Sequence, residues 1–123
     1  PKDIVRATIE AVAYQTYDLF EAMKHDGLRP KIVKVDGGMV MNNWFSQFLS
    51  DVVNVKVLRP KVQETTAAGA AFMAGLKIGI YKSLKDISKN WNLDRKFSPT
   101  MKNNSRNVLI KGWSTAIKRT LIN

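Results

Sequence analysis

The chain has 123 residues, of which 45% are hydrophobic, so it is long enough and apolar enough for one compact domain with a buried core. It contains no cysteine, which excludes a disulfide framework and a thiolate metal site. The formal net charge of +10 suggests a nucleic-acid-binding module, but the basic residues are scattered, and no RNA-recognition signature or zinc finger occurs. We therefore predict no nucleic-acid partner.

No apolar run approaches the ~20 residues that span a membrane, and the first residues lack the pattern of a signal peptide. We therefore expect no membrane span and a cytoplasmic location. The sequence starts at Pro1 rather than at a methionine, which we interpret as a cut within a longer protein. On this interpretation, residues 1–123 are a single-domain fragment.

A long amphipathic helix is predicted over residues 3–25. Its apolar stripe consists of Ile4, Val5, Ile9, Val12, Ala13, Leu19, Phe20 and Met23. Asp3 is the expected N-cap, and Gly27 is the expected stop. His25, the only histidine, lies near the helix end, where we expect a surface residue rather than a catalyst or metal ligand.

The central stretch of the chain reads as strand, glycine turn and helix. Residues 32–35 are an apolar run with β-branched side chains, which predicts a buried strand. Gly37 and Gly38 break that strand, and Asn42 or Asn43 is a suitable N-cap for the following helix. This order places free backbone N–H groups at the carboxyl end of a strand, which favours phosphate or another anion. An ordinary tight connection is the alternative interpretation.

A second strand is predicted over residues 55–58 and is expected to close at Pro60, which gives a βαβ unit with parallel neighbouring strands. The next helix is expected to begin near Thr65 or Thr66, with Glu64 close to the positive end of its dipole. Small residues recur along this helix at four-residue spacing, so we expect it to be buried or packed against a second helix.

The last third of the chain is predicted to contain two helices. Ser83 is the expected cap of a short helix over residues 83–91, and residues 92–104 are expected to form a polar, irregular connection. A final helix follows. Its apolar side consists of Leu109, Trp113, Ala116, Ile117, Thr120 and Leu121.

The chain offers little catalytic chemistry of its own. No Ser-His-Asp or Cys-His set is available. Asp36 is a candidate Mg²⁺ ligand, but an aspartate before two glycines more often hydrogen-bonds its own turn. Asp51 lies one helical turn after Gln47, and we expect it to make a structural hydrogen bond. We predict no catalytic residue and no metal ligand in this chain.

Several linked motifs carry a resemblance to a known family. These are the opening run of residues 4–19, Val35-Asp-Gly-Gly-Met-Val-Met-Asn-Asn, Gln47-Phe48, Asp51, Arg59-Pro60, residues 64–75, Gly112-Trp113 and residues 116–119. In this order and at these intervals, they resemble the carboxy-terminal part of the FGGY carbohydrate kinases, particularly the members that phosphorylate glycerol. The resemblance covers nearly all 123 residues.

The resemblance implies an α/β fold: a partial actin-like (ribonuclease H-like) ATPase domain with a small sheet flanked by helices. It implies that the whole protein uses ATP and Mg²⁺ to convert glycerol to glycerol 3-phosphate, and that it is a homo-oligomer. The catalytic and magnesium-binding aspartates and the glycerol contacts would lie mostly upstream, so the fragment alone would be inactive. The residues that carry over are nucleotide contacts: Gly38 and Asn42, with Gly37 required for the turn.

Some positions depart from the family pattern. Phe72 stands where the family often has tyrosine, so a hydrogen bond is lost there, and residues 39–41 are bulkier than usual. Asp36 and residues 64–66 favour glycerol as the acceptor. The alternatives are an FGGY kinase for xylulose or gluconate, a basic nucleic-acid-binding module, and a non-catalytic interaction domain.

Overall fold

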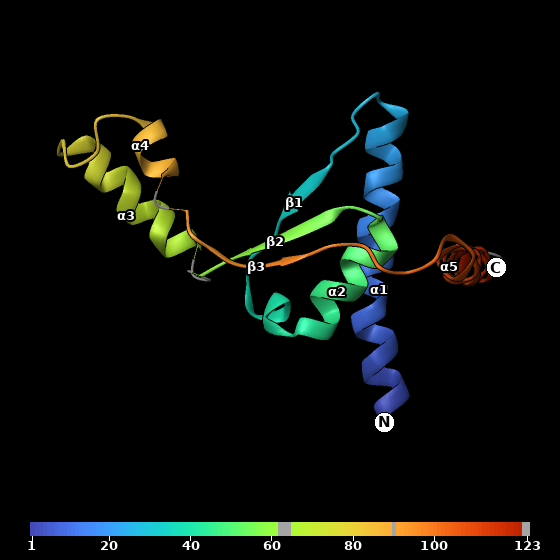
Figure 1. Ribbon diagram of the computed structural model, residues 1–123. Coiled ribbons are helices and arrows are strands. Elements are labelled where there is room, and N and C mark those ends of the chain that lie inside the picture. The colour runs from blue at the N-terminus through green and yellow to red at the C-terminus, as the bar shows by residue number, and fades with distance from the viewer. Residues whose placement is uncertain (62–64, 90, 122–123) are drawn as a thin grey trace.

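The computed structural model describes residues 1–61, 65–89 and 91–121. Figure 1 shows a small sheet with helices packed beside it and a separate pair of helices beyond the sheet. The elements in chain order are α1 (Lys2–His25), β1 (Ile32–Lys34), the 3₁₀-helix η1 (Gly38–Met41), α2 (Asn43–Val53), β2 (Lys56–Pro60), α3 (Thr65–Lys77), α4 (Leu84–Ser88), β3 (Leu93–Phe97) and α5 (Asn103–Leu121).

The sheet has the strand order β1-β2-β3. β1 and β2 run parallel, with Val33 opposite Val57, which confirms the predicted βαβ unit. β2 and β3 run antiparallel, with Val57 opposite Phe97. β2 extends through Pro60 instead of closing before it, and the register shifts between Arg59 and Pro60. Proline has no N–H to donate, so an irregular register is expected there.

The strand β3 was not predicted, because an irregular connection was expected over residues 92–104. Four of the five β3 residues are exposed, and only Phe97 is buried. An edge strand of this kind lacks the alternation of apolar and polar residues from which strands are recognised. Its pairing with β2 therefore depends on tertiary contacts that the local sequence does not reveal.

The core lies between α1, α2 and the sheet. α2 supplies its centre, because eight of its eleven residues are buried. The buried apolar side chains are Ala13, Tyr14, Phe20, Val40, Phe45, Phe48, Leu49, Val52, Val53, Val55, Val57 and Phe97. Tyr14 joins α1 to α2 and α5, since its ring meets Phe48 of α2 edge-on at 5.8 Å and stacks on Trp113 of α5 at 5.4 Å.

Two burial predictions were wrong. β1 is not a buried strand: Ile32 is 53% exposed, because within the described residues β1 pairs on one side only, with β2. α3 is also largely exposed, and Figure 1 shows it projecting from the end of β2 together with α4. Of the small residues of α3, Gly75 serves a local contact, because a Cβ there would meet the Tyr81 ring at 2.8 Å.

The helix ends follow the predictions in part. Asp3 is not the N-cap of α1; that position is Pro1, and no side-chain hydrogen bond caps the helix. α1 ends at His25, and Gly27 follows with a φ of +85°. Ser83 caps α4 as expected, accepting the backbone N–H of Asp86. Glu64, which was expected near the start of α3, lies outside the described residues. Within the described parts of the chain, no helix is long and apolar enough to cross a membrane.

Candidate functional site

The glycine turn lies at the carboxyl end of β1. The backbone N–H of Val35 still donates to the Leu58 carbonyl at 3.0 Å, which extends the parallel pairing one residue beyond β1. Gly37 then adopts a φ of +92°, a conformation that L-residues rarely tolerate, so glycine is required there. Gly38 begins η1, and no atom lies within 4 Å of the place where its Cβ would be. The Gly38 surface is therefore open.

Asn42 caps the helix that follows the turn. Its Oδ1 accepts the backbone N–H of Trp44 at 2.9 Å and that of Phe45 at 3.3 Å. The structure therefore decides between the two predicted caps, because Asn43 is already within α2. Since Oδ1 faces two donors, Nδ2 is the end of the exposed Asn42 amide that points away from the helix. The turn thus offers a side-chain donor at a helix N-terminus.

A buried arginine supports the turn from behind. Arg59 of β2 is 5% exposed, and its Nη1 donates to the Val40 carbonyl at 2.9 Å and to Asn43 Oδ1 at 3.0 Å. Its Nε donates to Asp94 Oδ2 at 2.8 Å. Arg59 is among the residues that carry the family resemblance, but no role was predicted for it. The available signal was a charged residue directly after a predicted strand. A charge needs a partner if it is buried, but the local sequence does not identify that partner.

The acidic residues of the predicted motifs play different roles. The structural hydrogen bond expected of Asp51 is confirmed, because its Oδ1 accepts the backbone N–H groups of Thr100 at 2.6 Å and Met101 at 3.0 Å. Asp36 is exposed at the start of the turn. His25 is exposed, as expected. No group of three His, Cys, Asp or Glu side chains suited to a metal ion occurs in the part of the chain that the structure describes.

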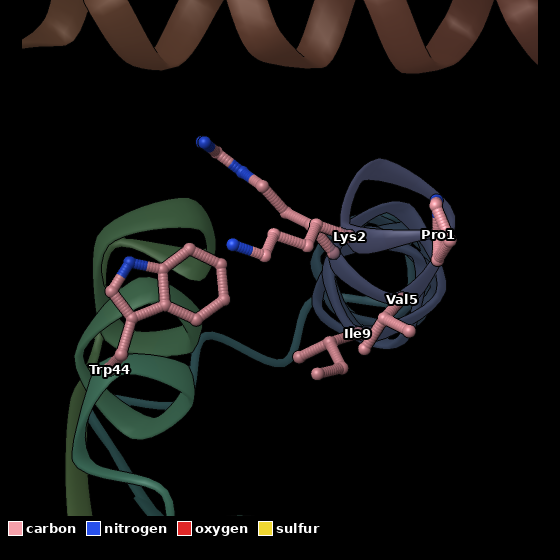
Figure 2. A pocket seen from close by; sticks show the side chains of 6 residues that line it. Pro1, Lys2, Val5, Ile9 and Trp44 are labelled. Atoms are coloured by element: carbon pink, nitrogen blue, oxygen red, sulfur yellow. The ribbon is translucent and has the colours of Figure 1, made fainter.

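A groove lies next to the end of the turn, between α1 and the start of α2. Figure 2 shows Lys2, Val5 and Ile9 of α1 on one side and Trp44 of α2 on the other. The groove volume is about 490 Å³. Trp44 is held by stacking on Phe48, with ring centroids 5.1 Å apart. The walls are therefore mostly apolar, with basic side chains at the rim.

Comparison with known proteins places the chain in a family. Residues 1–78 match the profile of the FGGY family of carbohydrate kinases, C-terminal domain. The chain belongs to this family. The match includes β1, the glycine turn, η1, α2 and β2, so Gly37, Gly38, Asn42 and Arg59 lie within the family domain. The resemblance found in the sequence is thereby confirmed.

Curated relatives lie within the same family. The chain is 52% identical over 118 residues to glycerol kinase 1 of Pseudomonas aeruginosa, and 50% identical over 119 residues to a glycerol kinase of Gluconobacter oxydans. Both alignments cover 96% of this chain but only 24% and 23% of the relatives. This chain therefore spans about a quarter of the length of the curated relatives that it matches.

Solved structures confirm the predicted α/β fold. The glycerol kinase of Plasmodium falciparum, crystallised with ADP, superposes with a TM-score of 0.81 at 36% identity, over 98% of this chain and 24% of that one. The xylulose kinase of Lactobacillus acidophilus gives a TM-score of 0.73 at 21% identity, over 96% of this chain and 24% of that one, and shows likeness of fold alone. The small sheet flanked by helices is thus the carboxy-terminal architecture of an FGGY kinase.

Proposed function

We propose that this chain forms one side of the ATP site of a glycerol kinase, and that the whole protein transfers the γ-phosphoryl group of ATP to a terminal hydroxyl of glycerol. The observation that carries the proposal is the turn from β1 into α2. It combines an open glycine surface, a helix N-terminus and an outward-facing amide donor at one end of a strand. Such an arrangement suits the phosphates of a nucleotide.

The turn residues take separate roles in this proposal. Gly37 provides the backbone conformation that turns the chain, and Gly38 leaves room for the nucleotide to approach the main chain. Asn42 donates a hydrogen bond to the nucleotide through Nδ2, while its Oδ1 remains occupied in capping α2. These roles account for nucleotide binding, and they leave the phosphoryl-transfer chemistry to residues elsewhere in the whole protein.

Phosphoryl transfer needs charge neutralisation and a base that accepts the hydroxyl proton. Mg²⁺ supplies the neutralisation in this class of reaction. Mg²⁺ at such sites is usually held by one or two carboxylates together with the substrate phosphates, and the family resemblance implies that these carboxylates lie mostly upstream of this chain. We therefore propose that the Mg²⁺ ligands, the base and the glycerol contacts come from outside this chain, and that residues 1–123 act as one nucleotide-binding unit.

The acceptor is proposed from the relatives. Those that share about half of their aligned residues with this chain are named glycerol kinases, whereas the xylulose kinase and the gluconate kinase of Lactobacillus acidophilus share 21%. Glycerol is accordingly the acceptor that we propose. A cytoplasmic location and a homo-oligomeric state are further parts of the proposal, and both rest on the family resemblance.

The test is ADP formation by the whole protein that carries this chain, with ATP and Mg²⁺, and with glycerol, xylulose or gluconate offered separately. We expect ADP formation that depends on glycerol. Turnover with xylulose or gluconate alone would keep the kinase assignment and change the acceptor. No turnover with any of the three, from protein that is folded and binds no ADP, would refute the proposal.

A further inference from the structure

Arg59 connects three parts of the fold that are distant in sequence. Its guanidinium lies between β3 on one side and the segment from η1 to α2 on the other. Nε and Nη2 both lie 2.8 Å from Asp94 Oδ2. Nη1 donates to three oxygens, which are the Val40 carbonyl at 2.9 Å, the Met41 carbonyl at 3.2 Å and Asn43 Oδ1 at 3.0 Å.

These contacts account for the burial of a full positive charge. Burying an unpaired guanidinium is costly, and the cost falls only when a counter-charge and further acceptors surround it. Asp94 supplies the counter-charge, and η1 supplies two carbonyls that a short helix leaves without internal partners. The Phe97 ring, 5.4 Å from Arg59 Cζ, packs against the same group. The guanidinium is therefore fixed in both position and orientation.

The Arg59 contacts hold the chain on both sides of Asn42. Arg59 holds the carbonyl of the residue before Asn42 and the side chain of the residue after it. η1 itself has only four residues, and the Asn42 N–H donates to the Met39 carbonyl at 3.2 Å. Within the segment, Ser46 Oγ also donates to the Val40 carbonyl at 2.7 Å, and the Trp44 N–H holds Asn42 Oδ1. Arg59 ties this locally bonded segment to β2 and β3, so the placement of Asn42 Nδ2 relative to the sheet depends on the Arg59 contacts.

We propose that Arg59 is a positioning residue for nucleotide binding. It contacts no ligand, and it holds the Gly38 main chain and Asn42 Nδ2 in the arrangement that the nucleotide meets. This inference rests on the proposed function, because it assigns Arg59 a role at the same nucleotide site. Because we propose that the glycerol contacts lie outside this chain, we expect loss of the Arg59 contacts to act on nucleotide affinity and to leave glycerol affinity unchanged.

The chain offers a matched control for testing this role. Arg106 of α5 is also buried, and its guanidinium donates to the Asp51 carbonyl, to Asn103 Oδ1 and to the Met101 carbonyl. These contacts join the start of α5 to the carboxy-terminal half of α2, and none of them reaches η1. Lysine keeps the charge but cannot span acceptors on two sides as the guanidinium fork does. Arg59→Lys and Arg106→Lys therefore remove equivalent kinds of contact at different places.

The experiment measures the Kd for ADP and the KM for glycerol in the whole protein, with each variant beside the unsubstituted protein. We expect Arg59→Lys to weaken ADP binding about tenfold, which corresponds to the loss of ~1.4 kcal/mol. Its KM for glycerol should stay within about twofold of the original, and Arg106→Lys should bind ADP normally. Asp94→Asn, which keeps Arg59 but removes its counter-charge, serves if Arg59→Lys does not fold; we expect it to weaken ADP binding about threefold.

Hydrogen–deuterium exchange provides a readout that does not depend on the nucleotide. We expect faster exchange of the backbone amides at residues 41–46 in Arg59→Lys, and no such change in Arg106→Lys. Unchanged ADP affinity in the folded Arg59 and Asp94 variants would overturn the inference, as would equal losses in Arg59→Lys and Arg106→Lys. Absence of ADP binding by the unsubstituted protein would instead refute the proposed function, and the positioning role with it.

Discussion

The side-chain oxygen of Asn42 accepts the backbone N–H of Trp44 at 2.9 Å, and this contact decides which end of the Asn42 amide is available to a ligand. In our proposal, capping and ligand contact are thus divided between the oxygen and the nitrogen of one side-chain amide. The division is testable, because substitutions exist that remove one of these functions without the other.

Asn42→Ser should keep the cap and lose the outward donor, whereas Asn42→Ala should lose both. Serine caps helices about as well as asparagine, so we expect the free energy of unfolding of Asn42→Ser to change by only a few tenths of a kcal/mol. Asn42→Ala should lose ~1 kcal/mol. Both variants should bind ADP about five- to tenfold more weakly, because one hydrogen bond is lost. Urea unfolding and calorimetric titration measure the two effects. A serine variant with normal ADP affinity would show that Nδ2 makes no contact with the nucleotide.

Gly38→Ala and Gly37→Ala should distinguish the effect of filling ligand space, at Gly38, from the effect of backbone strain, at Gly37. Gly37 has a φ of +92°, so we expect alanine there to cost about 1–2 kcal/mol of stability. No φ in the left-handed region constrains Gly38, and no neighbour lies within 4 Å of its Cβ position, so Gly38→Ala should fold normally.

Gly38→Ala should nevertheless weaken ADP binding, and Gly38→Val should weaken it further, because the added carbons occupy space that we assign to the nucleotide. Thermal unfolding and ADP titration of the three variants measure these effects. Equal ADP affinity in Gly38→Val and the unsubstituted protein would place the ligand elsewhere.

Asp51→Ala should destabilise the fold without affecting nucleotide binding. The carboxylate holds the segment before α5 by accepting the N–H groups of Thr100 and Met101. Hydrogen bonds to a charged group are worth roughly 1.5–3 kcal/mol each, and part of this is recovered when water solvates the freed donors, so we expect a loss of about 2–3 kcal/mol. Urea unfolding measures the loss. A fall in ADP affinity of the folded variant would show that Asp51 also acts at the site.

Tyr14 should make the fold sensitive to alkaline pH. Burial raises the pKa of its phenol, with the nearby Glu10 carboxylate adding to the effect. The unfolded chain then loses this proton first, near pH 10, so the free energy of unfolding should fall as the pH rises above about 10 and be fully retained below it. Tyr14→Phe should lose this part of the pH dependence. Urea unfolding of both proteins at a series of pH values from 8 upward checks the expectation, and parallel curves would contradict it.

The part of the fold that could be predicted is the part whose pattern is local. The apolar spacing of α2, its asparagine cap and the break at Gly37 and Gly38 are all visible in a short stretch of sequence, and the structure contains each of them. The pairing of β3 and the exposure of β1 depend on partners far away along the chain, so short-range patterns could not reveal them.

In the candidate site, too, the residues close together in sequence could be predicted and the long-range contacts could not. Gly37, Gly38 and Asn42 follow one another within six residues, so the sequence alone could bring them together. Arg59 and Asp94 reach the site only through the sheet, because β2 carries one and β3 carries the other. A long-range ion pair has no local signature, and the support behind the turn was therefore missed.

The Arg59–Asp94 ion pair also bears on where the functional unit ends. The family domain matches residues 1–78, whereas Asp94 lies on β3, beyond that boundary. A protein shortened to residues 1–78 would keep the whole glycine turn and Arg59 but lose the carboxylate, leaving a guanidinium that is buried in the intact fold without its counter-charge. Because the Asp94 side chain is 39% exposed, the cost is smaller than the roughly 3–5 kcal/mol of breaking a fully buried pair, but it still falls on a buried guanidinium. The smallest piece able to hold the glycine turn in shape is therefore longer than the stretch by which the family is recognised.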